Sequence, residues 1–173
     1  MRTKYFLFLW GWLFLFPLSV KAQTFDGARA HRTTNQSISN NAQTIVGFPS
    51  EASPNGYDTT GYHDTSTNPG RMTTSIAGYY RFVANIYFAG NSNGIRTIQI
   101  RRNGTTIVGY CSWEPEGASN IQIHQCVGEW QEQTPSAYYE VYVYQNSGAA
   151  LDVVADSSTG HSTTWFAIQY LGN

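Results

Sequence analysis

Apolar and polar residues alternate along much of the chain after residue 24, which is the pattern of β-strands. The clearest case runs from Tyr80 to Phe88, where every second residue is apolar, while the positions between them mix polar and aromatic side chains. Such a strand is typical of a sheet that covers a core on one face and meets solvent or a partner on the other. No stretch between residues 24 and 173 shows a sustained helical period, so we expect an all-β domain.

Clusters of Gly, Asn, Pro and Ser separate the runs that are rich in β-branched and aromatic residues. Residues 49–70 form a long polar connection, as in the crossovers of Greek-key and jelly-roll sandwiches. The sequence therefore predicts a ten-stranded jelly-roll β-sandwich. Its strands are expected at 27–33, 43–48, 71–75, 79–89, 95–101, 105–113, 121–130, 138–144, 151–155 and 164–171.

The first 22 residues differ in kind from the rest. Arg2 and Lys4 precede an apolar run over residues 5–20, and Val20 and Ala22 supply the small residues of a cleavage site. This is the pattern of a secretory signal peptide cleaved after Ala22. As a helix the run would reach only about 24 Å, short of the roughly 30 Å hydrocarbon core. We therefore expect a signal peptide at 1–22, a domain at 23–173 and secretion to the extracellular space, with a retained signal anchor as the alternative.

Charge limits the partners of the secreted part. It has no lysine, and seven arginines face eleven carboxylates, so its formal charge is about −4 instead of the −1 of the whole chain. Nucleic acids and anionic membranes usually bind clustered Lys and Arg, so neither is an expected partner. The one basic pair, Arg101-Arg102, is interpreted as a solvated hairpin end.

The chain has two cysteines, Cys111 and Cys126, and in an exported protein an even count favours a disulfide. We expect residues 106–113 and 120–130 to form a hairpin that brings the two cysteines opposite each other. A metal-binding or catalytic thiol pair is the alternative, although the intervening residues match no compact ligand motif.

Several short motifs occur in the order found in one known family, from residue 25 to residue 173. The chain resembles the complement C1q globular head, within the C1q and tumour-necrosis-factor-like jelly-roll superfamily, in its collagen-free secreted form. One departure is Pro135-Ser136-Ala137, where the family usually carries Gly-Asp. The motifs that carry the resemblance are Gly27-Ala28-Arg29-Ala30, Gly61-Tyr62-His63-Asp64, Ala77-Gly78-Tyr79-Tyr80-Arg81-Phe82, Arg102-Asn103-Gly104, the strand at 138–144, and Ser162-Thr163-Thr164-Trp165-Phe166.

The resemblance implies a non-enzymatic homotrimer in which three jelly rolls pack around a threefold axis. The 12 tyrosines suit such an interface, because each combines an apolar ring with a polar tip, but they suit ordinary sandwich packing equally. No nucleophile elbow, phosphate loop or His-Glu-x-x-His motif occurs. The carboxylates Glu114 and Glu116 share a loop, yet nothing in the sequence fixes the separation that glycoside hydrolysis needs.

Candidate ligands for a metal are few, and no cofactor is expected. Asp152 and Asp156 flank a loop rich in hydroxyls, which makes calcium a candidate, as in some relatives. His63-Asp64 with Asp58 is a second candidate, with a solvated loop as its alternative. Asn35 and Asn103 begin N-glycosylation sequons if the host is eukaryotic.

Two functions follow from these features. The first is a secreted recognition module that binds a glycan or cell-surface macromolecule through loops at one end. The second is a structural subunit of an extracellular fibre, matrix or envelope assembly, joined by an edge strand such as 23–34. The contact residues expected for the first function are Tyr57, Tyr62, His63, Trp113, Glu114 and Glu116.

Overall fold

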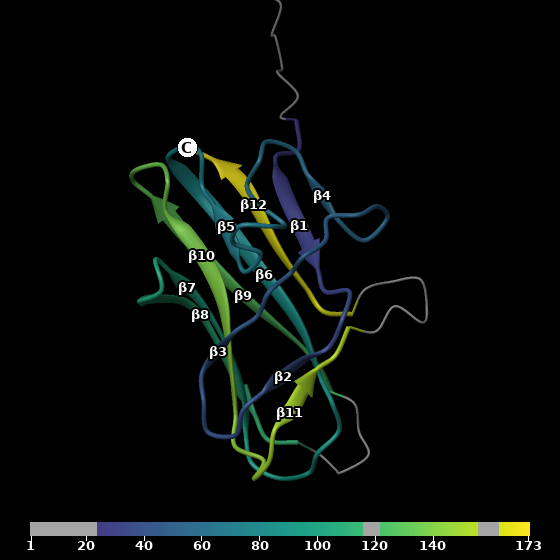
Figure 1. Ribbon diagram of the computed structural model, residues 1–173. Coiled ribbons are helices and arrows are strands. Elements are labelled where there is room, and N and C mark those ends of the chain that lie inside the picture. Colours follow the sequence, from purple (N-terminus) through teal and green to yellow (C-terminus); the bar gives the residue numbers. More distant parts are fainter. Residues whose placement is uncertain (1–23, 116–121, 156–162) are drawn as a thin grey trace, which may run out of the picture.

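The longest predicted strand organises one of two sheets in the computed structural model, which describes residues 24–115, 122–155 and 163–173 (Figure 1). β6 (Gly78–Phe88) pairs along its whole length with β9 (Gln122–Glu132) and on its other side with β12 (Trp165–Gly172). We call this layer sheet A. The remaining strands of sheet A are β1 (Gly27–His31), β2 (Gln36–Ile38), β4 (Tyr57–Asp58) and β11 (Leu151–Val153).

Sheet B lies against sheet A and is built around β10 (Tyr138–Gln145). β7 (Arg96–Arg102) pairs with β10 over seven residues, and β8 (Thr106–Trp113) pairs with β7. The short strands β3 (Thr44–Ile45) and β5 (Arg71–Thr73) also pair with β10. The described residues form no helix, so the all-β sandwich predicted from the alternation is confirmed.

The structure describes twelve strands where the sequence predicts ten. β2 and β4 were not predicted, because neither has an apolar run of its own and each is held only by pairing, with β11 and β1 respectively. The strand expected at 43–48 shrinks to β3. The signal peptide expected at 1–22 lies outside the described residues, and within the described part no helix is long and apolar enough to span a membrane.

The core between the sheets is aromatic. The five apolar side chains that alternate along β6, from Tyr80 to Phe88, are all fully buried, as their spacing predicts. Phe82 stacks on Tyr139 of β10 with ring centroids 3.9 Å apart, which joins sheet A to sheet B at the centre of the molecule. Burying rings of this size supplies much of the hydrophobic stabilisation of a sandwich.

One charged group is buried beside this aromatic stack. The carboxylate of Glu132, at the end of β9, accepts two hydrogen bonds from the guanidinium of Arg102, at 2.6 and 2.7 Å. It accepts a third, of 2.9 Å, from the Tyr139 hydroxyl. The Arg102 partner lowers the pKa of Glu132, because it favours the ionised form. The buried charge is therefore fully partnered, and it ties β9 of sheet A to β7 and β10 of sheet B.

The Asn-Gly turn predicted between two strands is confirmed. Asn103 and Gly104 have φ angles of 49° and 72°, the left-handed pair of a type I′ turn, and they connect β7 to β8. The backbone N–H of Asn103 donates to the carbonyl of Tyr138, and the Asn103 side chain accepts from the Tyr138 N–H. This turn is thereby fixed to the start of β10.

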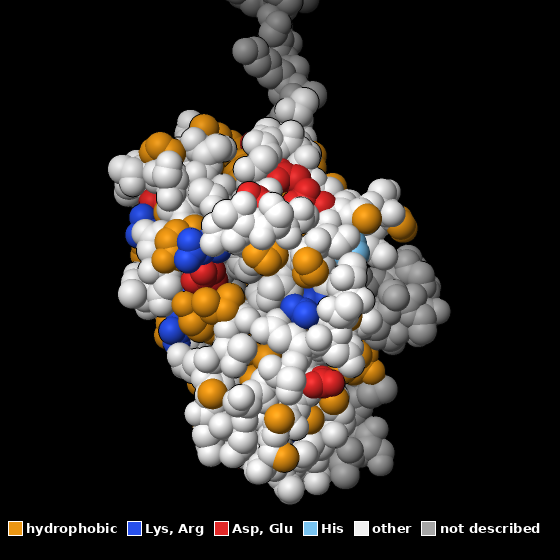
Figure 2. All heavy atoms as spheres, in the orientation of Figure 1, with side chains coloured by type: hydrophobic (Ala, Val, Ile, Leu, Met, Phe, Trp, Pro, Cys, Tyr) orange, Lys and Arg blue, Asp and Glu red, His pale blue; other side chains and the backbone are white. Residues whose placement is uncertain are grey.

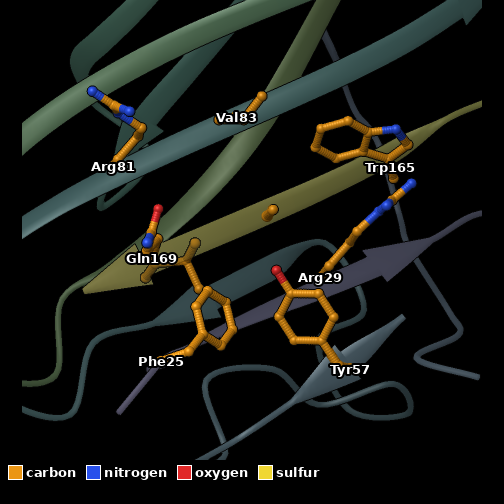
Figure 3. A pocket seen from close by; sticks show the side chains of 9 residues that line it. Phe25, Arg29, Tyr57, Arg81, Val83, Trp165 and Gln169 are labelled. Atoms are coloured by element: carbon orange, nitrogen blue, oxygen red, sulfur yellow. The ribbon is translucent and has the colours of Figure 1, made fainter. Parts of the chain in front are cut away.

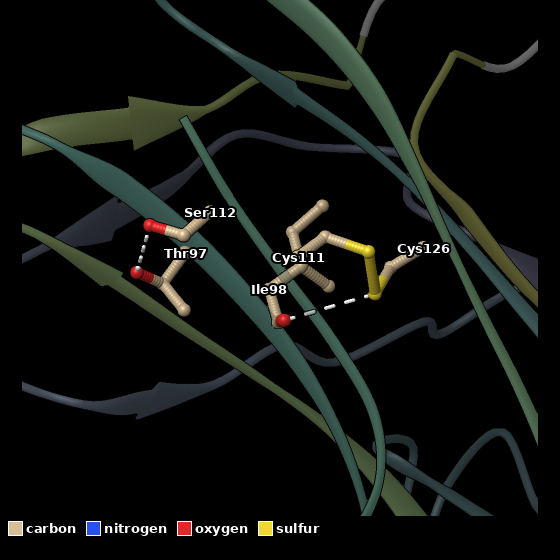
Figure 4. The surroundings of a disulfide bond; sticks show 5 residues. All are labelled: Thr97, Ile98, Cys111, Ser112 and Cys126. Atoms are coloured by element: carbon tan, nitrogen blue, oxygen red, sulfur yellow. Dashed lines mark hydrogen bonds between the residues drawn. A yellow bond between two sulfur atoms is a disulfide. The ribbon is translucent and has the colours of Figure 1, made fainter. Parts of the chain in front are cut away.

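The hairpin expected between the two cysteine strands is wrong, although the disulfide itself is present. β8 pairs with β7 and β9 pairs with β6, so the two strands belong to different sheets. The Cys111–Cys126 bond spans a Cα–Cα distance of 5.7 Å and closes one edge of the sandwich (Figure 4). It is a covalent link between the sheets instead of a link within one of them.

Two glycines let β8 and β9 approach each other beside this disulfide. A Cβ added to Gly109 would lie 2.9 Å from the carbonyl oxygen of Val127, and one added to Gly128 would lie 2.8 Å from that of Val108. Both contacts are with backbone atoms, which cannot rotate away. At these two positions the backbones of β8 and β9 can approach only because neither residue has a side chain.

Gly128→Ala tests this close approach. The added methyl group would push β9 away from β8, so we expect the free energy of unfolding to fall by about 1–3 kcal/mol in urea denaturation. Gly47→Ala is the matched control, because its nearest heavy atom would be an Arg32 side-chain nitrogen at an ordinary 3.6 Å. We expect the control to change stability by less than about 1 kcal/mol. Equal losses of stability from the two substitutions would contradict the close approach of β8 and β9.

Candidate binding surfaces

The predicted contact residues of the long connection divide into exposed and buried ones. Tyr57 is 40% exposed on β4. Tyr62 is 1% exposed, and its hydroxyl donates to Asp26 at 3.0 Å, while its ring packs edge-on against Tyr80. Burial raises the pKa of the Tyr62 hydroxyl. The expectation that Tyr62 contacts a ligand from an exposed loop is therefore wrong.

His63 is also a structural residue. Its side chain is fully buried, its Nδ1 lies 2.5 Å from a carboxylate oxygen of Glu51, and its Nε2 lies 3.2 Å from the Pro69 carbonyl oxygen. The two ring nitrogens thus join the ends of the connection to each other. The exposure expected of His63 is wrong for the same reason as for Tyr62: this connection folds back onto the sandwich.

Asp58 causes much of this folding. Its carboxylate accepts the backbone N–H groups of Thr60, Gly61, Tyr62 and His63 at 2.8 to 3.2 Å. A carboxylate committed to four amides organises a turn and has little capacity left for a cation. The metal candidate built on His63, Asp64 and Asp58 is therefore a turn in the structure.

The second group of predicted contacts lies at the far end of the molecule. Trp113 packs edge-on against Phe88, stacks on His124 at 3.6 Å and donates to the side chain of Gln122. Tyr62 instead meets Tyr80, eight residues earlier on β6, which corresponds to about 27 Å of extended strand. Glu114 is exposed next to Trp113, and Glu116 lies outside the described residues. The two groups therefore do not form one site.

The other candidate residues lie on the surface. Asp152, on β11, accepts a 3.5 Å hydrogen bond from Asn35, and its proposed calcium partner Asp156 lies outside the described residues. Within the described ranges, no three His, Cys, Asp or Glu side chains gather in a group that would hold a metal. Both sequon asparagines are exposed, Asn35 before β2 and Asn103 in the type I′ turn.

A feature that the sequence did not reveal is an apolar groove on the outer side of sheet A (Figure 3). Phe25 and Tyr57 pack edge to face at 5.4 Å, and Trp165 lies on the neighbouring strand. The Arg29 guanidinium lies 4.3 Å above the Trp165 ring. Together with Val83 these side chains enclose about 220 Å³. The alternation of residues in β1 and β12 could have indicated that Arg29 and Trp165 face away from the core. The sequence could not show that Tyr57 of β4 lies beside them, because that contact forms only in the folded chain.

The groove continues into a wider apolar face. Val83 lies directly opposite Val127 on one side and Ala167 on the other, all pointing away from the core. Tyr79, Ile123 and Val127 are each 47–49% exposed. The pair Arg81–Glu129, 2.6 Å apart, crosses the same surface. We call this surface, with the groove, the outer face of sheet A.

Arg29 is the polar group least satisfied in this face. Its Nε is buried and has no hydrogen-bond partner among the described residues. Burial lowers the pKa of Arg29, since a cation is costly away from water. A half-buried cation beside exposed aromatic rings is typical of a surface that is completed by another molecule.

Comparison with known proteins supports the fold. No family model and no curated protein matches the chain. Among solved structures, the TNF protein Eiger from S. frugiperda matches with a TM-score of 0.53 at 12% sequence identity, covering 87% of this chain and 95% of that one. The protein is therefore a TNF-like jelly roll, which confirms the predicted fold class. This likeness concerns the fold alone, so the closer resemblance to the C1q globular head stays a prediction.

His63→Ala tests the structural role of the buried imidazole. The substitution leaves a cavity and removes the partner of Glu51, so we expect the free energy of unfolding to fall by about 2–3 kcal/mol. Thr65→Ala, in the same connection but exposed and outside the groove, should cost less than about 1 kcal/mol. Urea denaturation measures the free energy of unfolding of both variants. A His63→Ala variant as stable as the wild type would contradict the structural role of the buried imidazole.

Proposed function

We propose that the protein is a secreted, non-enzymatic recognition module that assembles as a homotrimer through the outer face of sheet A and binds a glycan or cell-surface macromolecule. The observation that carries the assembly is the set of exposed apolar side chains that extends from the aromatic groove over Val83 and Val127 to Ile123, with only a few polar side chains among them. Soluble monomers seldom expose such contiguous patches without a partner to cover them.

A second copy of the chain is the partner that the fold favours. The C1q and TNF-like resemblance implies three jelly rolls side by side, and the TNF-like fold supports that expectation. The apolar surface lies on the outer side of β6 and β9, the two longest described strands, which pair along their whole length. The predicted contacts Trp113 and Glu114 and the surface of β10 on sheet B lie outside it and would remain free to contact a ligand.

Binding is favoured over catalysis by how the carboxylates are used. Glu129, Glu132 and Glu140 form ion pairs with Arg81, Arg102 and Arg71, and Glu51 is bound to the His63 imidazole. Carboxylates engaged by fixed partners support the structure and are not poised beside a substrate for proton transfer. The disulfide supports secretion, since such bonds persist in oxidising compartments.

Val127→Glu tests the proposed assembly. A carboxylate in the middle of an apolar interface would be desolvated without a partner, so we expect light scattering to show the wild type as a trimer and the variant as a monomer. Ile45→Glu, 39% exposed on β3 of sheet B, is the matched control and should remain trimeric. Since Val127 is half exposed, urea denaturation should show that the variant monomer is folded.

Other outcomes bear on the alternative function. A wild-type monomer, or a trimer unaffected by Val127→Glu, would contradict the proposed interface. Filaments in electron microscopy would contradict the discrete trimer and support the fibre or matrix subunit.

A further inference from the structure

A small polar pocket lies on sheet B, away from the outer face of sheet A. It encloses about 270 Å³ where β5, the start of β10 and the end of the long connection meet. Figure 2 shows charged and hydrophobic side chains interleaved on the flank of the molecule where Figure 1 places β10. We call this pocket the β5–β10 pocket, and the residues that line it are Asp64, Asn68, Arg71, Thr73, Ser136 and Tyr138.

The two charged side chains of the pocket are held rigid by their neighbours. The Nε of Arg71 donates to Glu140 at 2.8 Å, and its guanidinium stacks 4.0 Å above the Tyr138 ring. The Asp64 Oδ1 accepts the N–H groups of Ser66 and Thr67 and the Ser66 hydroxyl, at 2.8 to 2.9 Å. These groups therefore need little ordering when a ligand binds, which favours affinity.

The donors and acceptors of the pocket are mixed in a way that suits hydroxyl groups. A sugar hydroxyl both donates and accepts, and among the lining residues a carboxylate accepts, a guanidinium donates, and one amide and three hydroxyls do both. The exposed part of the Tyr138 ring offers an apolar surface for the C–H face of a sugar ring. A volume just below the roughly 300–1,000 Å³ of pockets for drug-sized ligands suits a single ring.

The charges also select the class of sugar. Asp64 is exposed at the rim, and its backbone donors hold its pKa well below the usual range, so it is ionised at neutral pH. The Arg71 charge is already balanced by Glu140, which is 3% exposed. An anionic sugar would meet the Asp64 carboxylate without an unpaired cation in compensation. A neutral sugar meets no such penalty.

Ser136 lines the pocket and has an unusual backbone conformation. Its φ of 76° lies in the left-handed region, which residues other than glycine rarely adopt, and its N–H is tied to the carbonyl of Thr74. This is the segment where the chain departs from the Gly-Asp of the family it resembles. Conformations of this kind gather at binding sites, where the surrounding structure maintains them.

We infer that the β5–β10 pocket binds one ring of a neutral hexose, as a terminal residue of a glycan. This inference rests on the proposed recognition function and names its ligand class and site. The pocket is on sheet B and the proposed trimer interface is on sheet A, so three copies of the pocket would be open at once. Weak single-ring binding would then be strengthened by multivalency.

The test is a titration of the protein with the methyl glycosides of glucose, galactose and mannose. The methyl glycoside of glucuronate serves as the anionic comparison, and binding is monitored by NMR amide shifts. We expect one neutral glycoside to shift the amides of Asn68, Thr73 and Ser136. Asp64→Asn keeps an Oδ1 for the turn, and Asn68→Ala removes one amide, so each should weaken binding about tenfold. Asn93→Ala, an exposed asparagine outside the pocket, should leave binding unchanged.

Three results would overturn the inference: no binding of any neutral glycoside, binding of glucuronate alone, or unchanged binding by both pocket variants. An array of oligosaccharides with the same terminal sugar separates a glycan end from a free monosaccharide, and preference for the free sugar counts against a glycan. Light scattering of the same samples keeps this test separate from the assembly. A trimer without sugar binding refutes the pocket alone, and a sugar-binding monomer refutes the trimer alone.

Discussion

The structure depends on how β8 and β9 cross at one edge of the sandwich. No backbone ladder pairs these two strands, yet they approach so closely that Gly109 and Gly128 leave no room for a side chain. The disulfide between Cys111 and Cys126 fixes that approach covalently. Because β8 ends sheet B and β9 ends sheet A, this contact sets the relative position of the layers and holds Phe82 over Tyr139.

The local features of the fold were predictable because each depends only on residues that are close together in the sequence. The apolar alternation on β6 and the Asn103-Gly104 turn need no information from elsewhere in the chain. Strand partners are different. Nothing between Cys111 and Cys126 distinguishes a hairpin from a change of sheet, since both bring the cysteines together. The glycines in the interiors of β8 and β9 were the available signal, because glycine within a strand often marks a close backbone approach.

The site was less predictable than the fold, for the same reason. Tyr62 and His63 lie in a stretch of Gly, Asp and Thr that has the composition of an exposed loop. The four amides bound by Asp58 and the Glu51 partner of His63 turn that stretch inward. These contacts depend on how the connection folds back on itself, which its composition does not reveal. The groove of Phe25, Tyr57 and Trp165 likewise joins three distant segments. The result is a division of surfaces: sheet A carries the largely apolar face that we propose for self-association, and the polar pocket that we propose for recognition lies beside β10.

The most direct test of the central constraint is urea unfolding of the protein with the Cys111–Cys126 bond intact and after both cysteines are replaced by alanine. A bond that closes a loop of 15 residues should contribute about 3 kcal/mol, so we expect the free energy of unfolding to fall by that amount. The core stack should loosen at the same time, visible as a loss of near-ultraviolet circular dichroism. An unchanged free energy of unfolding would contradict the claim that this edge holds the two sheets together.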